Sequence, residues 1–211
     1  EVHVAGRDTR PIDGTPPSGG CFEHRIDCLE TGSAHSLLGE LRATHWLHLA
    51  WFTESPAYWT SPLNLRWLEA SIGWVQAFTA HGGRRVVGAG TCAEYDWSAG
   101  WCLEASTPCR PATLYGAAKL ALCGVQQAWC AQHGVSAAWG RVFHLYGPGE
   151  HPNRFVASVI RALLRGERAM CSRGNQERDL LHVEDVAAAM AICREEGVPV
   201  LPRGGGTSQC G

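Results

Sequence analysis

The pentapeptide Tyr115-Gly116-Ala117-Ala118-Lys119 is the centre of the stretch around which this chain is organised, which runs from Thr91 to Lys119. Lys119 is the only lysine in the chain, because every other Lys or Arg position is an arginine. Residues four apart share one face of a helix, so the Tyr115 phenol and the Lys119 ammonium can meet. A nearby cation lowers the pKa of a tyrosine from about 10, which prepares the phenol to exchange protons near neutral pH. The alternative is an ordinary exposed tyrosine–lysine pair.

Length and composition indicate one globular domain with a real core, since the chain has 211 residues, 45% of them hydrophobic. The net charge of −2 gives no electrostatic reason to expect nucleic acid or a membrane as partner. The ten cysteines form no CxxC pair, and their spacings suit neither a zinc site nor a small disulfide scaffold. We therefore predict no metal and a reducing, cytoplasmic location. The sequence shows no signal-peptide pattern and no apolar run of membrane-spanning length.

Strand and helix patterns alternate along the chain, which predicts an α/β fold with a parallel sheet covered on both faces. Ser33 is a candidate helix N-cap. Residues 90–111 are predicted to form a long loop of the kind that carries function. Residues 1–196 form the predicted catalytic domain, and residues 197–211 an irregular tail. The predicted strands are 2–5, 24–27, 46–51, 85–89, 135–143 and 169–172, and the predicted helices are 33–43, 62–80, 112–133, 152–164 and 183–195.

Five segments, in order and at consistent intervals, carry a resemblance to a known family. They are Asn64 on a helix, Gly88–Tyr95 (GAGTCAEY), Tyr115–Lys119 preceded by Pro111, Arg141–Pro148 (RVFHLYGP) and Arg178–Val186 (RDLLHVEDV). Together they resemble the extended short-chain dehydrogenase/reductase family, the NAD(P)-dependent epimerases and dehydratases of nucleotide sugars. The matching segments cover about residues 1–195. The resemblance implies a Rossmann-like, doubly wound parallel sheet.

The same resemblance implies hydride transfer between a nicotinamide ring and a sugar carbon. Tyr115 would be the general acid and base, Thr91 would bind the reacting oxygen, and Lys119 would lower the tyrosine pKa and bind the nicotinamide ribose. We expect the three to converge at the C-terminal edge of the sheet. Trp51 and Tyr58 are candidates for packing over cofactor or sugar, although buried aromatics are more common. Cofactor contacts are implied at Arg7, Asp27, Ala50, Lys119 and Phe143, and substrate contacts at Asn153, Arg154 and Arg178.

Four further positions in the motifs have weaker assignments. A guanidinium binds phosphate oxygens in a bidentate manner, so Arg178 is a candidate for the nucleotide diphosphate, with a solvated surface arginine as the alternative. His182 and Asp185 are predicted to be structural, at the start and in the first turn of a helix. His144 stands where the family has an asparagine, and we predict that it belongs to the substrate wall.

The chain departs from the family at its beginning and at its end. It contains no GxxGxxG or GxGxxG turn, and it opens where the family's second strand should be. The resemblance therefore predicts a sheet truncated at the N-terminus, a strand at Val2 that pairs elsewhere or is displaced, and a mostly missing C-terminal substrate lobe. We expect a fragment of a longer protein that binds cofactor poorly by itself. The alternative from another class is a degenerate chain that only binds or associates.

The sequence also bears on the choice between NAD and NADP and on the type of reaction. Arg7 follows the first strand and suits a ribose 2′-phosphate, which favours NADP, whereas Asp8 keeps NAD open. The 4,6-dehydratases of the family carry Asp-Glu where this chain has Cys92-Ala93, so an epimerase or a 4-ketoreductase is favoured over a dehydratase. A reductase of a non-nucleotide carbonyl compound is an alternative. The sugar, the nucleotide base, the net redox course and the oligomeric state stay open, with a homodimer as one option.

Overall fold

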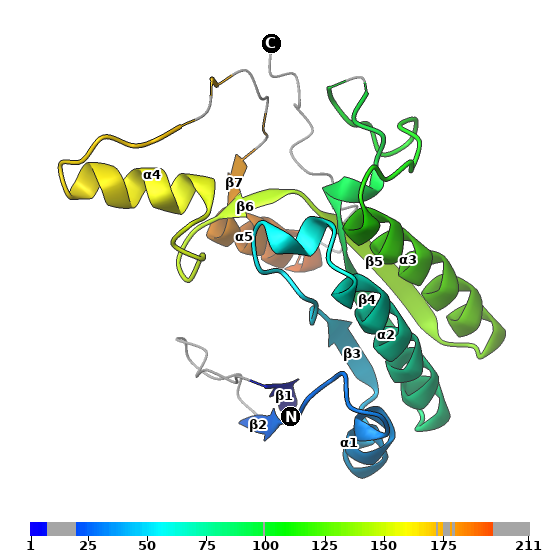
Figure 1. Ribbon diagram of the computed structural model, residues 1–211. Coiled ribbons are helices and arrows are strands. Elements are labelled where there is room, and N and C mark those ends of the chain that lie inside the picture. The colour runs from blue at the N-terminus through cyan, green and yellow to red at the C-terminus, as the bar shows by residue number, and fades with distance from the viewer. Residues whose placement is uncertain (8–19, 99, 172, 175–177, 179, 196–211) are drawn as a thin grey trace. The chain divides into compact units, whose positions relative to one another are not determined.

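The computed structural model describes residues 1–7, 20–98, 100–171, 173–174, 178 and 180–195 (Figure 1). The predicted tail and Asp8 lie outside these residues. Strands and helices alternate along most of the described chain, and short 3₁₀ turns occur at Ala57–Trp59 and Cys92–Glu94. The elements are β1 (Val2–Gly6), β2 (Cys21–Arg25), α1 (Ser33–Leu41), β3 (His45–His48), α2 (Leu63–Ala80), β4 (Arg85–Thr91), α3 (Leu114–Gln132), β5 (Ser136–Val142), β6 (His144–Tyr146), α4 (Phe155–Leu164), β7 (Leu180–His182) and α5 (Val183–Glu195).

The chain divides into two compact units. The first contains residues 1–52, 61–88 and 121–139, and the second contains residues 53–60, 89–120 and 140–211. Three elements, β4, α3 and β5, begin in one unit and continue into the other. The residues of the Thr91–Lys119 stretch therefore fall in the second unit together with the segments that follow β5.

The strands form three parallel arrangements rather than one continuous sheet. The order is β1-β2 in the first, β3-β4-β5 in the second and β6-β7 in the third. The strand at Val2 pairs with β2, in a parallel register from Val2 opposite Cys21 to Gly6 opposite Arg25. Of the two expectations for this strand, pairing elsewhere or displacement, the structure shows pairing, with β2. The Rossmann-like α/β class and the parallel strand direction are confirmed.

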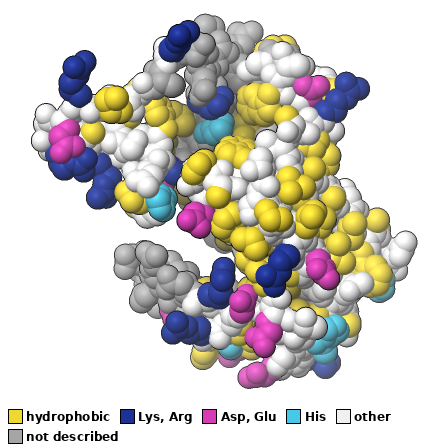
Figure 2. Space-filling model, viewed as in Figure 1, with side chains coloured by type: hydrophobic (Ala, Val, Ile, Leu, Met, Phe, Trp, Pro, Cys, Tyr) yellow, Lys and Arg dark blue, Asp and Glu magenta, His cyan; other side chains and the backbone are white. Residues whose placement is uncertain are grey.

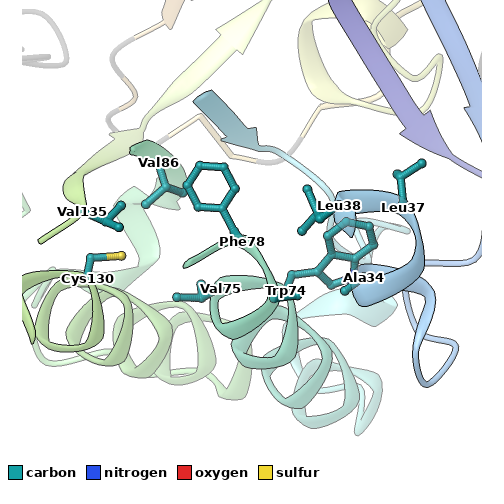
Figure 3. Close-up of a cluster of buried hydrophobic side chains, with 10 residues drawn as sticks. Ala34, Leu37, Leu38, Trp74, Val75, Phe78, Val86, Cys130 and Val135 are labelled. Carbon is teal, nitrogen blue, oxygen red and sulfur yellow. The ribbon is translucent and has the colours of Figure 1, made fainter. Parts of the chain in front are cut away.

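The core of the first unit lies between α1 and α2 and extends to α3 and β4 (Figure 3). On α2, side chains at helical spacing turn one face inward, and Phe78 at its centre is 1% exposed. Burial of a side chain of this size contributes about 2–3 kcal/mol. Cys123 and Cys130 are both buried, as their seven-residue spacing on one helix predicts. The members of the cluster are Ala34, Leu37, Leu38, Trp74, Val75, Ala77, Phe78, Val86, Cys130 and Val135.

The N-cap prediction for α1 is wrong. The N-cap is Gly32, whose φ of 88° is a left-handed conformation that glycine adopts without a Cβ clash. Ser33 is the first helical residue, and its hydroxyl donates to the carbonyl oxygen of Glu30 at 2.9 Å. The hydroxyl thus closes the preceding turn instead of capping the helix.

Two strand predictions also need correction. The second strand begins earlier than predicted, at Cys21, because its register with β1 fixes it, and Asp27 instead accepts a hydrogen bond from Leu29 N in the following turn. Residues 169–171 form no strand, and Ser172 lies outside the described residues. The third strand pair consists of β6 and β7, two segments of only three residues, which are too short for a sequence pattern to reveal.

The surface offers no sign of a membrane-crossing helix. Within the described part of the chain, none of the helices has the length and hydrophobicity needed to span a bilayer. Basic and acidic side chains are spread over several elements on the face shown in Figure 2. This distribution fits the small net charge of −2.

Candidate functional site

Thr91 is the last residue of β4 and the N-cap of the 3₁₀ turn that follows. Its hydroxyl oxygen accepts a hydrogen bond from Ala93 N at 3.2 Å, and its own backbone N donates to Oε1 of Glu94 at 2.9 Å. These reciprocal bonds form a capping box. Thr91 is 7% exposed, so one bond to its side chain and one from its backbone hold the residue in a buried place. The Thr-x-x-Glu spacing of this motif was available in the sequence, but sequence reasoning missed it.

Tyr115 lies in the first turn of α3 and meets Thr91. Burial raises the pKa of the Tyr115 phenol, and a hydrogen bond with the Thr91 side chain acts against that rise. The structure therefore brings together the two hydroxyl groups that sequence analysis named as a pair. Negative charge at Glu94 also raises the pKa of Tyr115, whereas the Arg154 cation acts to lower it.

Lys119 lies one helical turn after Tyr115 and is 3% exposed. Its Nζ donates to the backbone oxygen of Ala89, on β4, at 2.9 Å. Burial lowers the pKa of Lys119 to about 8, and the charge of Glu94 opposes this change. That Lys119 lowers the pKa of Tyr115 stays a prediction. The net direction is upward, because burial dominates, and the Arg154 cation acts against that rise.

Gly116 explains how α3 approaches the turn after β4 so closely. A Cβ at this position would lie 2.3 Å from the backbone oxygen of Ala93 and 2.9 Å from Cβ of Pro111. Only a residue without a side chain fits there, because the backbone oxygen of Ala93 cannot move away easily. The glycine in the Tyr-Gly-Ala-Ala-Lys sequence thus seats the first turn of α3 against the Thr91 turn.

Two aromatic rings surround the Tyr115 ring edge-on. The ring of Tyr58 lies 5.0 Å from it at an interplanar angle of 90°, and that of Trp59 lies 5.8 Å away at 84°. Such edge-to-face contacts restrict the orientation of the ring. Burial raises the pKa of Tyr58 to about 12, so this second phenol stays protonated at neutral pH. Sequence analysis named Tyr58, but Trp59 carried no signal of its own.

A pocket of about 560 Å³ lies in the same unit. It includes Arg154, one of the predicted substrate residues, whose charge acts on both Tyr58 and Tyr115. Asn153 is exposed next to it, and its backbone N donates to Nδ1 of His151 at 3.2 Å. The pocket is lined by Thr53, Glu54, Ser55, Leu145, Gly149, Glu150, His151 and Arg154.

The remaining motif residues of the second unit have defined surroundings. Arg178 is exposed and acts electrostatically on Cys92. Phe143 packs against the rings of Tyr95 and Trp97 at 6.1 Å each. His144 contacts the Trp97 ring. Phe143 and His144 are both half-buried. The cofactor role of Phe143 and the substrate-wall role of His144 stay predictions.

The start of α5 matches its structural prediction. His182 ends β7, and its Nδ1 accepts a hydrogen bond from the backbone N of Glu184 at 3.4 Å. Asp185 lies in the first turn of α5, where a negative charge complements the helix dipole.

The predicted cofactor residues of the first unit are found at the ends of its strands. Arg7 is exposed directly after β1, Asp27 is half-buried in the turn after β2, and Ala50 follows β3. Asn64 is fully buried; it accepts from Nε1 of Trp51 at 2.9 Å and donates to the Ser61 carbonyl oxygen at 2.9 Å. Trp51 thus holds the helix asparagine in place, a contact that sequence analysis did not foresee.

Comparison with known proteins identifies the relatives of the chain. The sequence profile of the NAD dependent epimerase/dehydratase family matches residues 1–200. A dTDP-glucose 4,6-dehydratase of Mycobacterium tuberculosis is 31% identical over 93 residues, which cover 44% of this chain and 28% of that protein. A CDP-abequose synthase of Salmonella typhimurium is 36% identical over 58 residues, which cover 27% of this chain and 19% of that protein.

Solved structures agree with this relationship. MoeE5 in complex with UDP-glucose and NAD is similar with a TM-score of 0.73 and 30% identity, over 90% of this chain and 62% of that chain. TunA, an NAD dependent NDP-hexosamine 5,6-dehydratase, has a TM-score of 0.73 and 25% identity, over 94% of this chain and 65% of that chain. The chain thus spans less than two thirds of the length of these structures. Because the family profile covers nearly the whole sequence, the chain belongs to the NAD dependent epimerase/dehydratase family.

Proposed function

We propose that this chain supplies the catalytic end of an NAD-dependent enzyme that epimerises or reduces a nucleotide-activated sugar, with Tyr115 as its general acid and base. The observation that carries the proposal is the contact between the Thr91 and Tyr115 side chains, one helical turn from the buried Lys119. Two hydroxyl groups held together in a buried place can bind one substrate oxygen between them. One fixed donor of this kind is worth on the order of 3 kcal/mol of transition-state stabilisation.

Each of these residues has a distinct task in the proposed reaction. A nicotinamide cofactor, when bound, would supply or accept the hydride. Because burial raises the pKa of Tyr115, its phenol is protonated at neutral pH and is prepared to donate to a carbonyl oxygen. The oxygen of Thr91 accepts from Ala93 N, so its hydroxyl hydrogen is the donor that faces the Tyr115 oxygen, and in the proposed reaction it would donate to a substrate oxygen bound there.

The position of Lys119 fits the nicotinamide end of a dinucleotide. A buried ammonium with a pKa of about 8 is largely charged at neutral pH, and it has three donors, one of which goes to Ala89 O. An ammonium donor of this kind suits ribose hydroxyls. The chain has no glycine-rich turn for the pyrophosphate, so the residues present fit one end of the cofactor. Cofactor roles for Arg7, Asp27, Ala50 and Phe143 stay predictions.

The turn after Thr91 favours epimerisation or ketone reduction over dehydration. Cys92 is buried, and burial raises the pKa of its thiol, so it stays neutral at physiological pH. Ala93 has no titratable group at all. These two positions, where the resemblance places Asp-Glu in 4,6-dehydratases, therefore provide neither an acid nor a base. The names of the relatives include dehydratases, so this choice rests on the residues of the chain itself.

A nucleotide sugar is the proposed substrate class. MoeE5 was solved with UDP-glucose, and the name of TunA includes an NDP-hexosamine. In this chain, Arg154 lines the pocket and acts on Tyr115, which suits an anionic substrate near the reacting tyrosine. These observations support a substrate role for Arg154, and substrate roles for Asn153 and Arg178 stay predictions.

Cofactor choice is part of the proposal. The family is NAD dependent, and MoeE5 was solved with NAD, so we propose NAD as the working cofactor. The preference for NADP that Arg7 suggests stays a prediction, which direct comparison of the two cofactors decides.

The test is Tyr115→Phe in the protein, assayed with UDP- and dTDP-sugars and NAD. We expect turnover to fall by roughly 10² to 10⁴ while the circular dichroism spectrum is unchanged, because only the proton carrier is removed. Tyr146→Phe is the matched control, since it deletes a phenolic hydroxyl beside His182 and should leave turnover intact. Normal turnover of Tyr115→Phe would disprove the assignment. Activity on simple ketones without a nucleotide would instead favour a reductase of non-nucleotide carbonyls.

A further inference from the structure

Glu94 is a carboxylate buried completely in the second unit, with 0% exposure. Its two oxygens have different partners. Oε1 accepts the backbone N–H of Thr91 at 2.9 Å, and Oε2 accepts Nε of Arg141 at 2.6 Å. Arg141 comes from β5, and its guanidinium also lies over the Tyr95 ring, 5.0 Å from the centroid. A single side chain therefore connects the end of β4 to β5.

The charge of Glu94 is not needed to cap the turn. A neutral glutamine in the same place would accept the Thr91 N–H equally well, and a capping box commonly uses either residue. A carboxylate is costly to bury unless a cation and hydrogen bonds compensate it. Arg141 supplies that compensation, and stacking on Tyr95 holds the guanidinium where Nε meets the carboxylate. The buried charge of Glu94 and the Arg141 cation that compensates it are thus not explained by the capping of the turn.

We propose that Glu94 and Arg141 are positioning residues of the reaction centre, with Glu94 fixing the backbone of Thr91 so that its hydroxyl meets Tyr115, and Arg141 fixing Glu94. The pair also sets the electrostatic balance at the two titrating groups that the reaction uses. This inference rests on the proposed function, since it assigns a role to residues behind Thr91 and Tyr115.

The sign of the electrostatic effect follows from the charges. The Glu94 carboxylate raises the pKa of Tyr115 and of Lys119, so it favours a protonated phenol and a charged ammonium. Loss of the Glu94 charge, with Arg141 still cationic, should lower the pKa of Tyr115. Loss of both the Glu94 and the Arg141 charge should return the pKa of Tyr115 toward its value in the unsubstituted protein. The groups that face Tyr115 from the elements around it are Tyr58, Cys92, Glu94 and Arg154, and Lys119 lies on its own helix.

The experiment is an ultraviolet titration of the tyrosines in the whole protein without substrate, with Tyr115 identified by difference against Tyr115→Phe. We expect Glu94→Gln to lower the pKa of Tyr115 by on the order of one unit. In the double variant Glu94→Gln/Arg141→Met, the pKa of Tyr115 should return most of the way to that of the parent. This variant leaves no buried charge without a partner, so it serves where the single variant folds poorly. Glu167→Gln is the matched control, because it breaks an exposed 2.8 Å ion pair with Arg165 and should change nothing.

A kinetic arm completes the test. In the active protein, Glu94→Gln should move the pH profile of kcat in the same direction as the titration, with little change in KM for the nucleotide sugar. If the pKa of Tyr115 is the same in Glu94→Gln as in the parent, the Glu94 charge does not act at the reaction centre, and the role proposed for the pair there is wrong. The titration needs no turnover, so an expected shift in a protein that is inactive on nucleotide sugars would overturn the proposed function and keep the pair's role.

Discussion

Replacement of Lys119 with methionine removes a buried ammonium and should change how stability depends on pH. The pKa of Lys119 is 10.5 as a free side chain and about 8 in the folded chain. Since the folded pKa is the lower one, the unfolded state binds more protons in the window between these values, and the free energy of unfolding rises with pH there. Linkage gives a rise of about 2 kcal/mol between about pH 8 and 10.

The assay is urea unfolding followed by tryptophan fluorescence, at several pH values across that window, for the parent and for Lys119→Met. Tyr58, Tyr115 and the buried cysteines have raised pKa values that act in the opposite direction, but they are present in both proteins and cancel in the difference. Arg161→Met, which removes an exposed cation from α4, is the control and should give a flat difference. If the difference in unfolding free energy between Lys119→Met and the parent is equally independent of pH, Lys119 keeps an ordinary pKa.

Three further predictions concern packing and cofactor binding. Gly116→Ala should destabilise the chain by about 1–3 kcal/mol, because its Cβ would meet Ala93 O. Gly124→Ala, which has open space on the same helix, should stabilise the chain by about 0.5–1 kcal/mol. Equal melting temperatures of the two variants would contradict this packing. Phe78→Ala should cost about 3–5 kcal/mol in urea unfolding and Phe155→Ala, which is exposed, about 0.5 kcal/mol or less; similar costs would show that the core is elsewhere. Calorimetry with NADH and NADPH on the 211-residue chain should give affinities weaker than about micromolar, since it has no glycine-rich turn, and micromolar binding would mean that another segment holds the phosphates.

The fold could be predicted where the sequence carries long periodic signals. The apolar spacing along α2 and the uninterrupted run of α3 gave helices close to the observed ones, and α5 was predicted with its observed bounds. Prediction failed where a partner strand decides the structure. The ends of β2 are fixed by its register with β1, and β6 and β7 exist only through each other. Such pairings depend on contacts between distant segments, and three residues hold too little local information to reveal them.

The candidate site divides in the same way. Tyr115 and Lys119 could be named because their residue types and spacing are unusual together, and Thr91 because its segment resembles the family's. The direction of the pKa change at Tyr115 could not be foreseen, since it depends on how deeply the phenol is buried and on which cation faces it. Glu94 and Arg141 are 47 positions apart in sequence, so their ion pair becomes visible only after β4 and β5 lie in one sheet.

The single lysine has a practical consequence for work with the folded protein. A protease that cuts only after lysine has one target bond in the whole chain, between Lys119 and Leu120. That bond lies within α3, and the Lys119 side chain that the protease must bind is buried, so cutting requires local opening of the helix. The rate at which fragments 1–119 and 120–211 appear therefore measures the opening of the segment that bears Tyr115. A compound that binds beside Tyr115 should slow this cleavage, which makes the unmodified chain its own reporter of ligand binding.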